Sequence, residues 1–298
     1  MHRLRLTPLA ADGLMLLAAF IWGVGFILQK YGSELLGAFT FTGLRFLLAA
    51  LLLVPFLFRG RFTSKELTRG AICGAVMAVA AVFQQWGIKT TTVGNAGFIT
   101  SMYVVIAPFI ALAFGQQIRR SIWMGLALVL PGLWFLSIDS EFAVQSGDPK
   151  ILACAVAWAV HILLVGRWTR DVDALRFAFL QFAITGVTAT ALGFTIDGPT
   201  RAQIDAAKWL IILAGIFPTC VAFTLQMIAQ RTAPATHAAI LLSLEAVFAM
   251  LAGVLLLSED VTSRKLTGAA LMLAGMIVAQ LRPTSASHPA PDGRSAAQ

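Results

Sequence analysis

Long apolar segments recur along this chain, and they constrain its fold more than any other feature. We count ten, at roughly residues 8–28, 36–58, 68–88, 94–115, 121–138, 150–167, 175–196, 207–229, 234–257 and 264–281. Most contain about 20 residues, and a helix of that length crosses the ~30 Å hydrocarbon core of a bilayer. Only 12% of the 298 residues are charged, whereas soluble domains have about 25%. The sequence therefore predicts an all-α membrane protein with ten transmembrane helices.

Positive charges are distributed unevenly over the short connections between these segments. If the N-terminus is cytoplasmic, 14 Lys and Arg residues fall on the cytoplasmic side and 7 on the outer side. Because cytoplasmic loops carry the excess of Lys and Arg, both termini are predicted to lie in the cytoplasm. The net charge of +8 is scattered over many loops. We therefore expect the lipid bilayer, and no nucleic acid, as a partner of this surface.

The second half of the sequence repeats features of the first half. Trp22 and Trp158 are 136 residues apart, and the same offset relates Arg45 to Gln181. The segment FITSMYVV at 98–105 aligns with ILLSLEAV at 240–247, so that Tyr103 corresponds to Glu245. This correspondence indicates that the chain holds two copies of one unit.

Each copy contains five apolar segments, and because five is odd, the second copy is inverted relative to the first. We expect a first five-helix repeat at 1–138 and a second, inverted repeat at 150–281. A periplasmic loop at 139–149 joins them, and a disordered cytoplasmic tail follows at 282–298. Inverted repeats with a binding site near the membrane midplane between them are typical of transporters.

Arg45 and Glu245 are ionisable residues deep inside predicted membrane helices. Arg45 lies ~13 Å below the outer surface and Glu245 ~16 Å above the inner surface, so their depths nearly coincide. Arg45 either binds a substrate carboxylate or is a structural arginine tied to helix carbonyls or to Glu245. Glu245 carries a proton, binds a substrate ammonium group, or bonds helix ends. We expect both to face a central cavity, close enough to interact directly or through water.

Other polar and aromatic residues are candidates for the same cavity. Trp22 and Trp158 either line it or simply pack between helices, and His161 lies one turn from Trp158 on the same helix face. The full set of candidate substrate-binding residues is Trp22, Arg45, Gln84, Tyr103, Trp158, His161, Gln181 and Glu245. The sequence contains no metal-ligand cluster, Gly-rich phosphate loop or nucleophile–base pair. We therefore expect no metal, no cofactor and no enzyme activity.

Small residues recur at positions where two helices could approach closely. Gly125 and Gly132 lie in GLALVLPG, and Gly268 and Gly275 lie in GAALMLAG, 143 residues later. Glycines spaced in this way let helix backbones come into contact. We predict a structural role for all four and place the fifth and tenth helices at the periphery.

Three stretches resemble the drug/metabolite transporter superfamily in its EamA-type, ten-helix branch. They are LLAAFIWGVGF at 16–26 with LRFLLAALLLVP at 44–55, LSLEAVFA at 242–249 with the LSE at 257–259, and the glycine-bounded 268–275. Similar proteins export amino acids and related metabolites from bacteria. Others in the superfamily move nucleotide sugars or triose phosphates.

The resemblance and the candidate residues together give a functional hypothesis. The chain is expected to be a multi-pass protein of a bacterial inner membrane that exports small metabolites, especially neutral or aromatic amino acids, by alternating access. Transport of anionic metabolites or sugar conjugates is an alternative, and a membrane enzyme or a non-transporting membrane protein is a more remote one. Substrate identity, energy source and oligomeric state are left open by the sequence.

Overall fold

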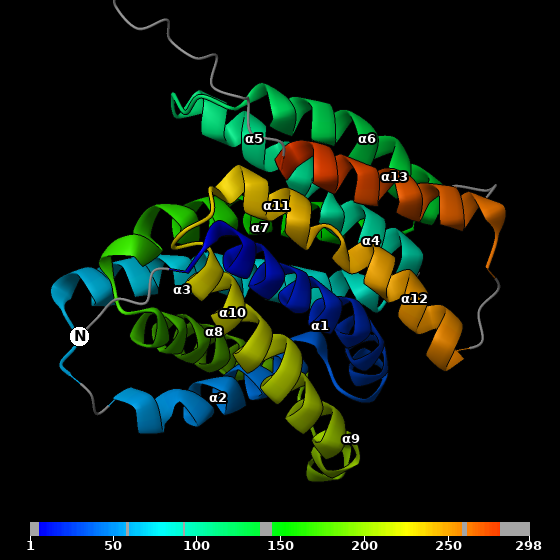
Figure 1. Cartoon of the computed structure of the whole chain (residues 1–298). Coiled ribbons are helices and arrows are strands. Elements are labelled where there is room, and N and C mark those ends of the chain that lie inside the picture. The colour runs from blue at the N-terminus through cyan, green and yellow to red at the C-terminus, as the bar shows by residue number, and fades with distance from the viewer. Residues whose placement is uncertain (1–5, 58–59, 92, 138–144, 258–260, 281–298) are drawn as a thin grey trace, which may run out of the picture.

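The structure is a computed structural model that describes residues 6–57, 60–91, 93–137, 145–257 and 261–280 (Figure 1). Every regular element in these ranges is helical. In chain order they are α1 (Pro8–Leu35), α2 (Ala38–Leu57), α3 (Ser64–Ile88), α4 (Val93–Ser101), α5 (Tyr103–Ala113), α6 (Arg120–Ser137), α7 (Asp148–Trp168), η1 (Thr169–Asp171), α8 (Ala174–Ile196), α9 (Arg201–Ala214), η2 (Gly215–Val221), α10 (Ala222–Ala229), α11 (Ala235–Leu242), α12 (Glu245–Leu257) and α13 (Ser263–Gln280).

Eight helical stretches in the described part of the chain are long and apolar enough to cross a membrane. They cover the first four and the sixth to ninth predicted segments, and the fifth segment forms a shorter apolar helix at Arg120–Phe135. α13, the tenth segment, does not belong to this set. The count of ten spans therefore stays a prediction. Most of the predicted connecting loop and the whole predicted tail lie outside the described residues.

Two helices begin earlier than their apolar segments predict, because a capping box starts each of them. The Thr63 side chain accepts a hydrogen bond from Glu66 N, and Glu66 bonds back to Thr63 N, so α3 begins at Ser64. Thr200 and Gln203 make the same reciprocal pair, so α9 begins at Arg201. Such a pair satisfies two backbone N–H groups that the first turn leaves free. Apolarity alone does not locate these polar first turns.

Two predicted segments are broken in the middle of their length. In the first segment, α4 ends at Ser101 and α5 begins at Tyr103. In the second, α11 ends at Leu242 and α12 begins at Glu245. Tight i→i−3 bonds replace the regular pattern at both breaks, from Met102 N to Ile99 O and from Leu244 N to Leu241 O. A short stretch of this tighter bonding inside a helix often marks a hinge. Tyr103 and Glu245, which correspond at the 142-residue offset, are thus each the first residue after a break.

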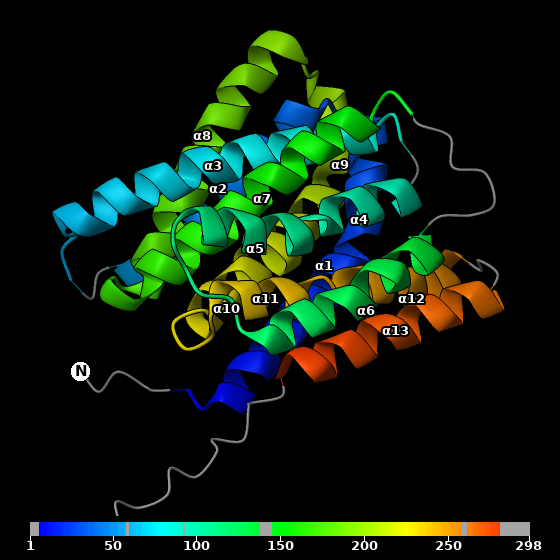
Figure 2. The same cartoon turned by 90° about the horizontal axis from the view of Figure 1, so that it is seen from above.

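α6 and α13 lie side by side along one edge of the molecule (Figures 1 and 2). A Cβ atom added to Gly125 would lie 2.7 Å from the carbonyl oxygen of Gly275, and one added to Gly132 would lie 2.8 Å from that of Gly268. The four glycines therefore let the two backbones touch, as the sequence predicts. Gly125 thus meets Gly275, and Gly132 meets Gly268.

α2 and α8 pack closely on another side of the bundle, and they contact each other through glycines as well. A Cβ on Gly186 would lie 2.7 Å from Leu47 N, and one on Gly43 would lie 2.4 Å from Thr190 N. Between this pair and the α6–α13 pair lie α1, α7, α10 and α11 (Figure 1). The site described below is lined by α1, α7 and α10 together with α2, α3, α4, α5, η2 and α12.

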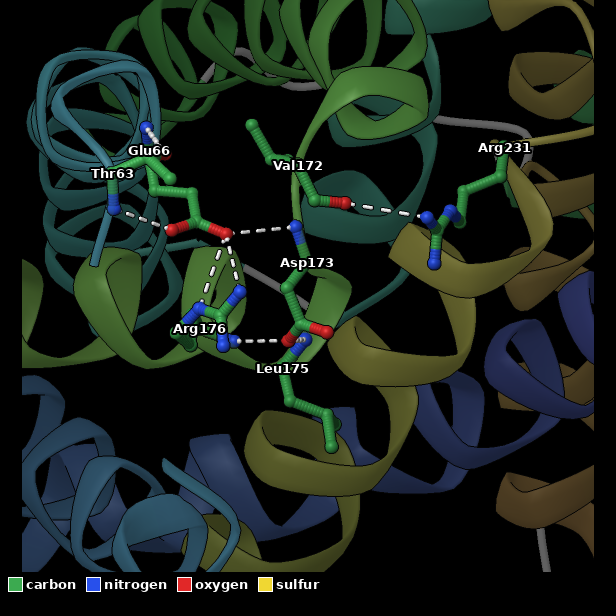
Figure 3. A network of polar contacts seen from close by, with 7 residues as sticks. All are labelled: Thr63, Glu66, Val172, Asp173, Leu175, Arg176 and Arg231. Carbon is green, nitrogen blue, oxygen red and sulfur yellow. Dashed lines mark hydrogen bonds and ion pairs between the residues drawn. The ribbon is translucent and has the colours of Figure 1, made fainter. Parts of the chain in front are cut away.

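A polar network ties the start of α3 to the start of α8 (Figure 3). Glu66 is 2% exposed, and its Oε1 accepts hydrogen bonds from Asp173 N and from Nε and Nη2 of Arg176, at 3.0–3.1 Å. Its Oε2 accepts from Thr63 N. A buried carboxylate with this many donors is well satisfied, so the network fixes the packing of these helix ends.

Candidate functional site

A cavity lies inside the helix bundle. Six of the eight residues predicted from the sequence line it: Trp22, Arg45, Gln84, Tyr103, Trp158 and Glu245. They come from α1, α2, α3, α5, α7 and α12, so both halves of the chain contribute. The cavity combines one guanidinium group, one carboxyl group, amides and aromatic rings.

Seven further residues complete the lining. They are Phe26, Gln29, Thr100, Ile162, Pro218, Phe223 and Gln226. Gln226 is an amide inside an apolar segment and Gln29 directly follows one, a signal that the sequence carries without indicating which amides face a cavity. Phe223 and Ile162 resemble their apolar neighbours in sequence, so only their position in the fold distinguishes them.

Aromatic rings form one side of the cavity, which we call the aromatic wall and define as Trp22, Trp158 and Phe223. The Phe223 ring stacks on Trp158 with a centroid distance of 5.3 Å, and its centroid lies 4.8 Å from that of Trp22. The Trp22 indole N–H donates a hydrogen bond of 2.8 Å to the carbonyl of Pro218. Pro218 belongs to η2, a π-helical turn of a kind often found at functional sites. The indole is therefore fixed by a polar contact as well as by packing.

Arg45 is a buried cation that has no ionic partner among the residues the structure describes. It is 3% exposed, and its guanidinium carbon lies 5.0 Å from the ring centroid of Phe46 and 6.0 Å from that of Phe41. Its Nε has no hydrogen-bond partner, and it forms no ion pair within the described part of the chain. The direct contact with Glu245 that we considered from the sequence is therefore not present among these residues. A guanidinium in this position can bind an incoming carboxylate through two parallel bonds.

Glu245 faces the cavity from the start of α12. It is 5% exposed, and its Oε1 accepts a hydrogen bond of 3.2 Å from the Tyr103 hydroxyl. The amide dipoles of α12 favour negative charge at this helix end. The described residues place no cation within ion-pair distance of its carboxyl group. Glu245 and Tyr103 correspond in the sequence repeat and touch each other in the fold.

His161 and Gln181 do not line the cavity in this structure. The His161 Nε2 lies 2.7 Å from Gln181 Oε1, and Gln181 Nε2 donates to the carbonyl of Phe177. Both side chains are 0% exposed, and the His161 ring packs edge-on against Trp158. His161 therefore packs against the aromatic wall, and Gln181 holds His161 through their hydrogen bond. The sequence places His161 one helical turn from Trp158, but this spacing does not show whether His161 faces the cavity or packs on the other side of the Trp158 ring.

Metal-binding geometry is absent from the described residues, where no group of three or more His, Cys, Asp or Glu side chains could hold an ion. The site instead offers one positive group, one acidic group and hydrogen-bonding amides around a space with an aromatic side. A membrane-embedded cavity of this composition, built on broken helices, is suited to binding a small polar molecule. These features are typical of a membrane transporter.

Comparisons with known proteins agree with this class. The EamA-like transporter family matches residues 9–138 and 145–280, so the chain belongs to that family. An uncharacterized transporter of Archaeoglobus fulgidus is 35% identical over 277 residues, covering 92% of this chain and 87% of the relative. The names of such relatives are those of transporters and not of enzymes.

Two further similarities concern function and fold separately. The threonine/homoserine exporter RhtA of Escherichia coli K12 is 26% identical over 269 residues, covering 87% of this chain and 86% of that protein. A protein of known crystal structure has a TM-score of 0.74 at 20% identity, covering 91% of this chain and 96% of the other. The crystal structure shows a shared fold.

Proposed function

We propose that this protein exports small zwitterionic metabolites, in particular neutral or aromatic amino acids, across a bacterial inner membrane. One observation carries the proposal: Arg45, whose Nε has no hydrogen-bond partner, and the carboxyl group of Glu245 line the same cavity. Isolated charges inside a membrane protein are costly and usually functional. A ligand that brings its own carboxylate and ammonium groups satisfies both at once.

Each part of an amino acid has a matching group in the cavity. Arg45 receives the carboxylate, because its Nε has no hydrogen-bond partner and a guanidinium forms charge-assisted bonds with carboxylates. Glu245 receives the ammonium group, while Tyr103 holds its Oε1 in place. The aromatic wall receives an apolar or aromatic side chain. The amides of Gln29, Gln84 and Gln226 are available to hydroxyl-bearing side chains.

Alternating access would operate on the two broken segments. The breaks are 142 residues apart, and each carries a cavity residue immediately after it. Discontinuous helices at equivalent positions of two repeats are a common way to build a transport site near the midplane. This arrangement supports the inverted-repeat interpretation and, with the charge bias of the loops, the placement of both termini in the cytoplasm.

Transport of anionic metabolites or sugar conjugates is the second candidate. Arg45 favours it, since an unpaired cation attracts any anion. Glu245 opposes it, because a second negative group near a phosphate would be repelled and Arg45 is the one cation among the described lining residues. The name of RhtA, which says that it exports threonine and homoserine, also favours the amino-acid class.

Flux through purified protein in liposomes tests the proposal. Radiolabelled L-threonine, L-phenylalanine and a sugar phosphate are compared by counterflow, with empty liposomes as the blank. We expect the two amino acids to exchange and the sugar phosphate not to. Exchange of the sugar phosphate alone would support the second candidate, and no flux of any amino acid would refute the proposal.

A variant of the aromatic wall sharpens the same assay. Trp158→Ala removes the ring that stacks on Phe223, and we expect phenylalanine exchange to fall about tenfold, which corresponds to ~1.4 kcal/mol, while folded protein is retained. The matched control is Trp209→Ala, because Trp209 is 66% exposed and does not line the cavity. Normal exchange by Trp158→Ala for every amino acid would remove the aromatic wall from the binding site.

A further inference from the structure

We propose that Glu245 is also a proton-binding site, and that entry of one proton is exchanged for export of one zwitterion. This inference rests on the proposed function, because it requires an ammonium-bearing substrate in the same cavity. It goes beyond that function by assigning the energy source of transport. The geometry around the Glu245 carboxyl group carries the argument.

The Glu245 carboxyl group has one oxygen occupied and one free. Its Oε1 accepts the hydrogen bond from Tyr103, and no described residue donates to its Oε2. A carboxylate buried without a cation costs several kcal/mol, so a positive partner must accompany it. The cavity gives that partner two possible forms, a proton from water or the ammonium group of a substrate.

Few other ionisable groups face Glu245. They are Tyr103 on α5, which donates to it, Cys154 on α7, and Arg45 across the cavity on α2. The helices packed against α12 are α1, α4, α6 and α13. In the part of the chain that the structure describes, they add no ionisable side chain to the cavity lining. Glu245 is thus the one carboxyl group of the described lining.

Competition between the two cations gives an exchange cycle in which every proton is accounted for and one net positive charge moves inward for each zwitterion exported. When the cavity faces the cytoplasm, a substrate ammonium group replaces the proton, which leaves to the cytoplasmic water, and pairs with the Glu245 carboxylate. When the cavity faces outward, the substrate leaves and a proton from the outer solution binds to Oε2. Tyr103 donates to Oε1 in both states, so it positions the group without changing its own protonation.

Proton release on binding tests this cycle directly. Purified protein in weakly buffered detergent solution is titrated with L-threonine or L-phenylalanine while a pH indicator counts released protons, at several pH values between about 5 and 9. We expect close to one proton per bound amino acid at the acidic end of this range and no release from Glu245→Gln. Glu34→Gln is the matched control, because Glu34 is exposed at the end of α1 and does not line the cavity; it should release protons as the wild type does.

A second measurement uses only the wild-type protein and so does not depend on the folding of a variant. In proteoliposomes with an acidic lumen, outward proton flow should drive labelled amino acid into the lumen above its outside concentration, and an ionophore that collapses the gradient should abolish this. Binding without proton release, and flux unaffected by the gradient, would overturn proton coupling while leaving amino-acid transport intact. Absence of both binding and flux for every amino acid would overturn the proposed function and this inference together.

Discussion

Arg45 is a residue whose burial lowers the stability of the fold and leaves its guanidinium group available to a ligand. Its guanidinium is surrounded by the rings of Phe41 and Phe46 and lacks an ionic partner among the described residues. Cation–π contacts return part of the cost of burial, about 0.5–2 kcal/mol. They do not replace the hydrogen bonds that water would supply. Residues that break a local stability rule in this way are often functional.

Replacement of Arg45 by methionine should separate stability from function. Methionine has a similar length and no charge, so we expect the free energy of unfolding to rise by about 1–3 kcal/mol. Amino-acid exchange should fall at least about tenfold, because the carboxylate loses charge-assisted bonds. Thermal unfolding in detergent and counterflow in liposomes measure the two effects.

The control for this prediction is Arg69→Met. Arg69 pairs with the exposed Asp171 at 3.1 Å outside the cavity, and surface pairs contribute at most about 1 kcal/mol. Exchange should therefore be unchanged. A destabilised Arg45→Met protein with normal exchange would show that Arg45 is a structural residue.

At the scale of elements, close backbone contacts and capped helix ends hold the bundle together. The glycines of α6 and α13 bring the two helices into direct contact at two points, and the capping boxes fix where α3 and α9 begin. Van der Waals packing of this kind is the main source of helix association where lipid surrounds the helices. The effect of a single substitution should therefore depend on which contact it meets.

Gly132→Ala should separate α6 from α13. The added methyl group would lie 2.8 Å from the carbonyl oxygen of Gly268, and because that neighbour is backbone, the helices must shift, at a cost of about 1–3 kcal/mol. Gly13→Ala is the control, since nothing lies within 4 Å of its added Cβ and alanine favours the helix by up to ~1 kcal/mol. Equal thermal stability of the two variants would contradict the close contact.

The two capping boxes should respond differently to the loss of the side chain at their third position. Glu66→Ala removes an ion pair with Arg176 and a bond to Asp173 N as well as the cap, so we expect a loss of about 3 kcal/mol. Gln203→Ala removes only a local, exposed cap, worth about 0.5–1 kcal/mol. Denaturation of the two variants in one detergent gives the comparison, and similar losses would mean that the network in Figure 3 contributes little.

For the molecule as a whole, orientation in the membrane follows from the loop charges. Fourteen Lys and Arg residues against seven predict that both termini lie in the cytoplasm. Fusions of a reporter active only in the cytoplasm should be active at the C-terminus and inactive after Glu141 in the connecting loop. Activity after Glu141, or an inactive C-terminal fusion, would require an odd number of spans or the reverse orientation.

The sequence by itself determined the class of protein, the helical segments and most of the candidate site. Apolar length reports membrane helices because lipid offers no partner for backbone hydrogen bonds. A polar residue inside such a segment, such as Arg45 or Glu245, stands out because its burial is costly. The repeat also related Tyr103 to Glu245 and Trp22 to Trp158, and all four line the cavity.

Only the tertiary structure decided which side of each helix meets the cavity and which groups touch. His161 lies behind Trp158 and bonds to Gln181, whereas Phe223, with no distinguishing sequence signal, completes the aromatic wall. Arg45 and Glu245 share the cavity without forming an ion pair between them. The physical reason is that the apolar pattern of a sequence describes each helix separately. The rotation of a helix about its axis is set by its contacts with other helices, such as those of the glycines.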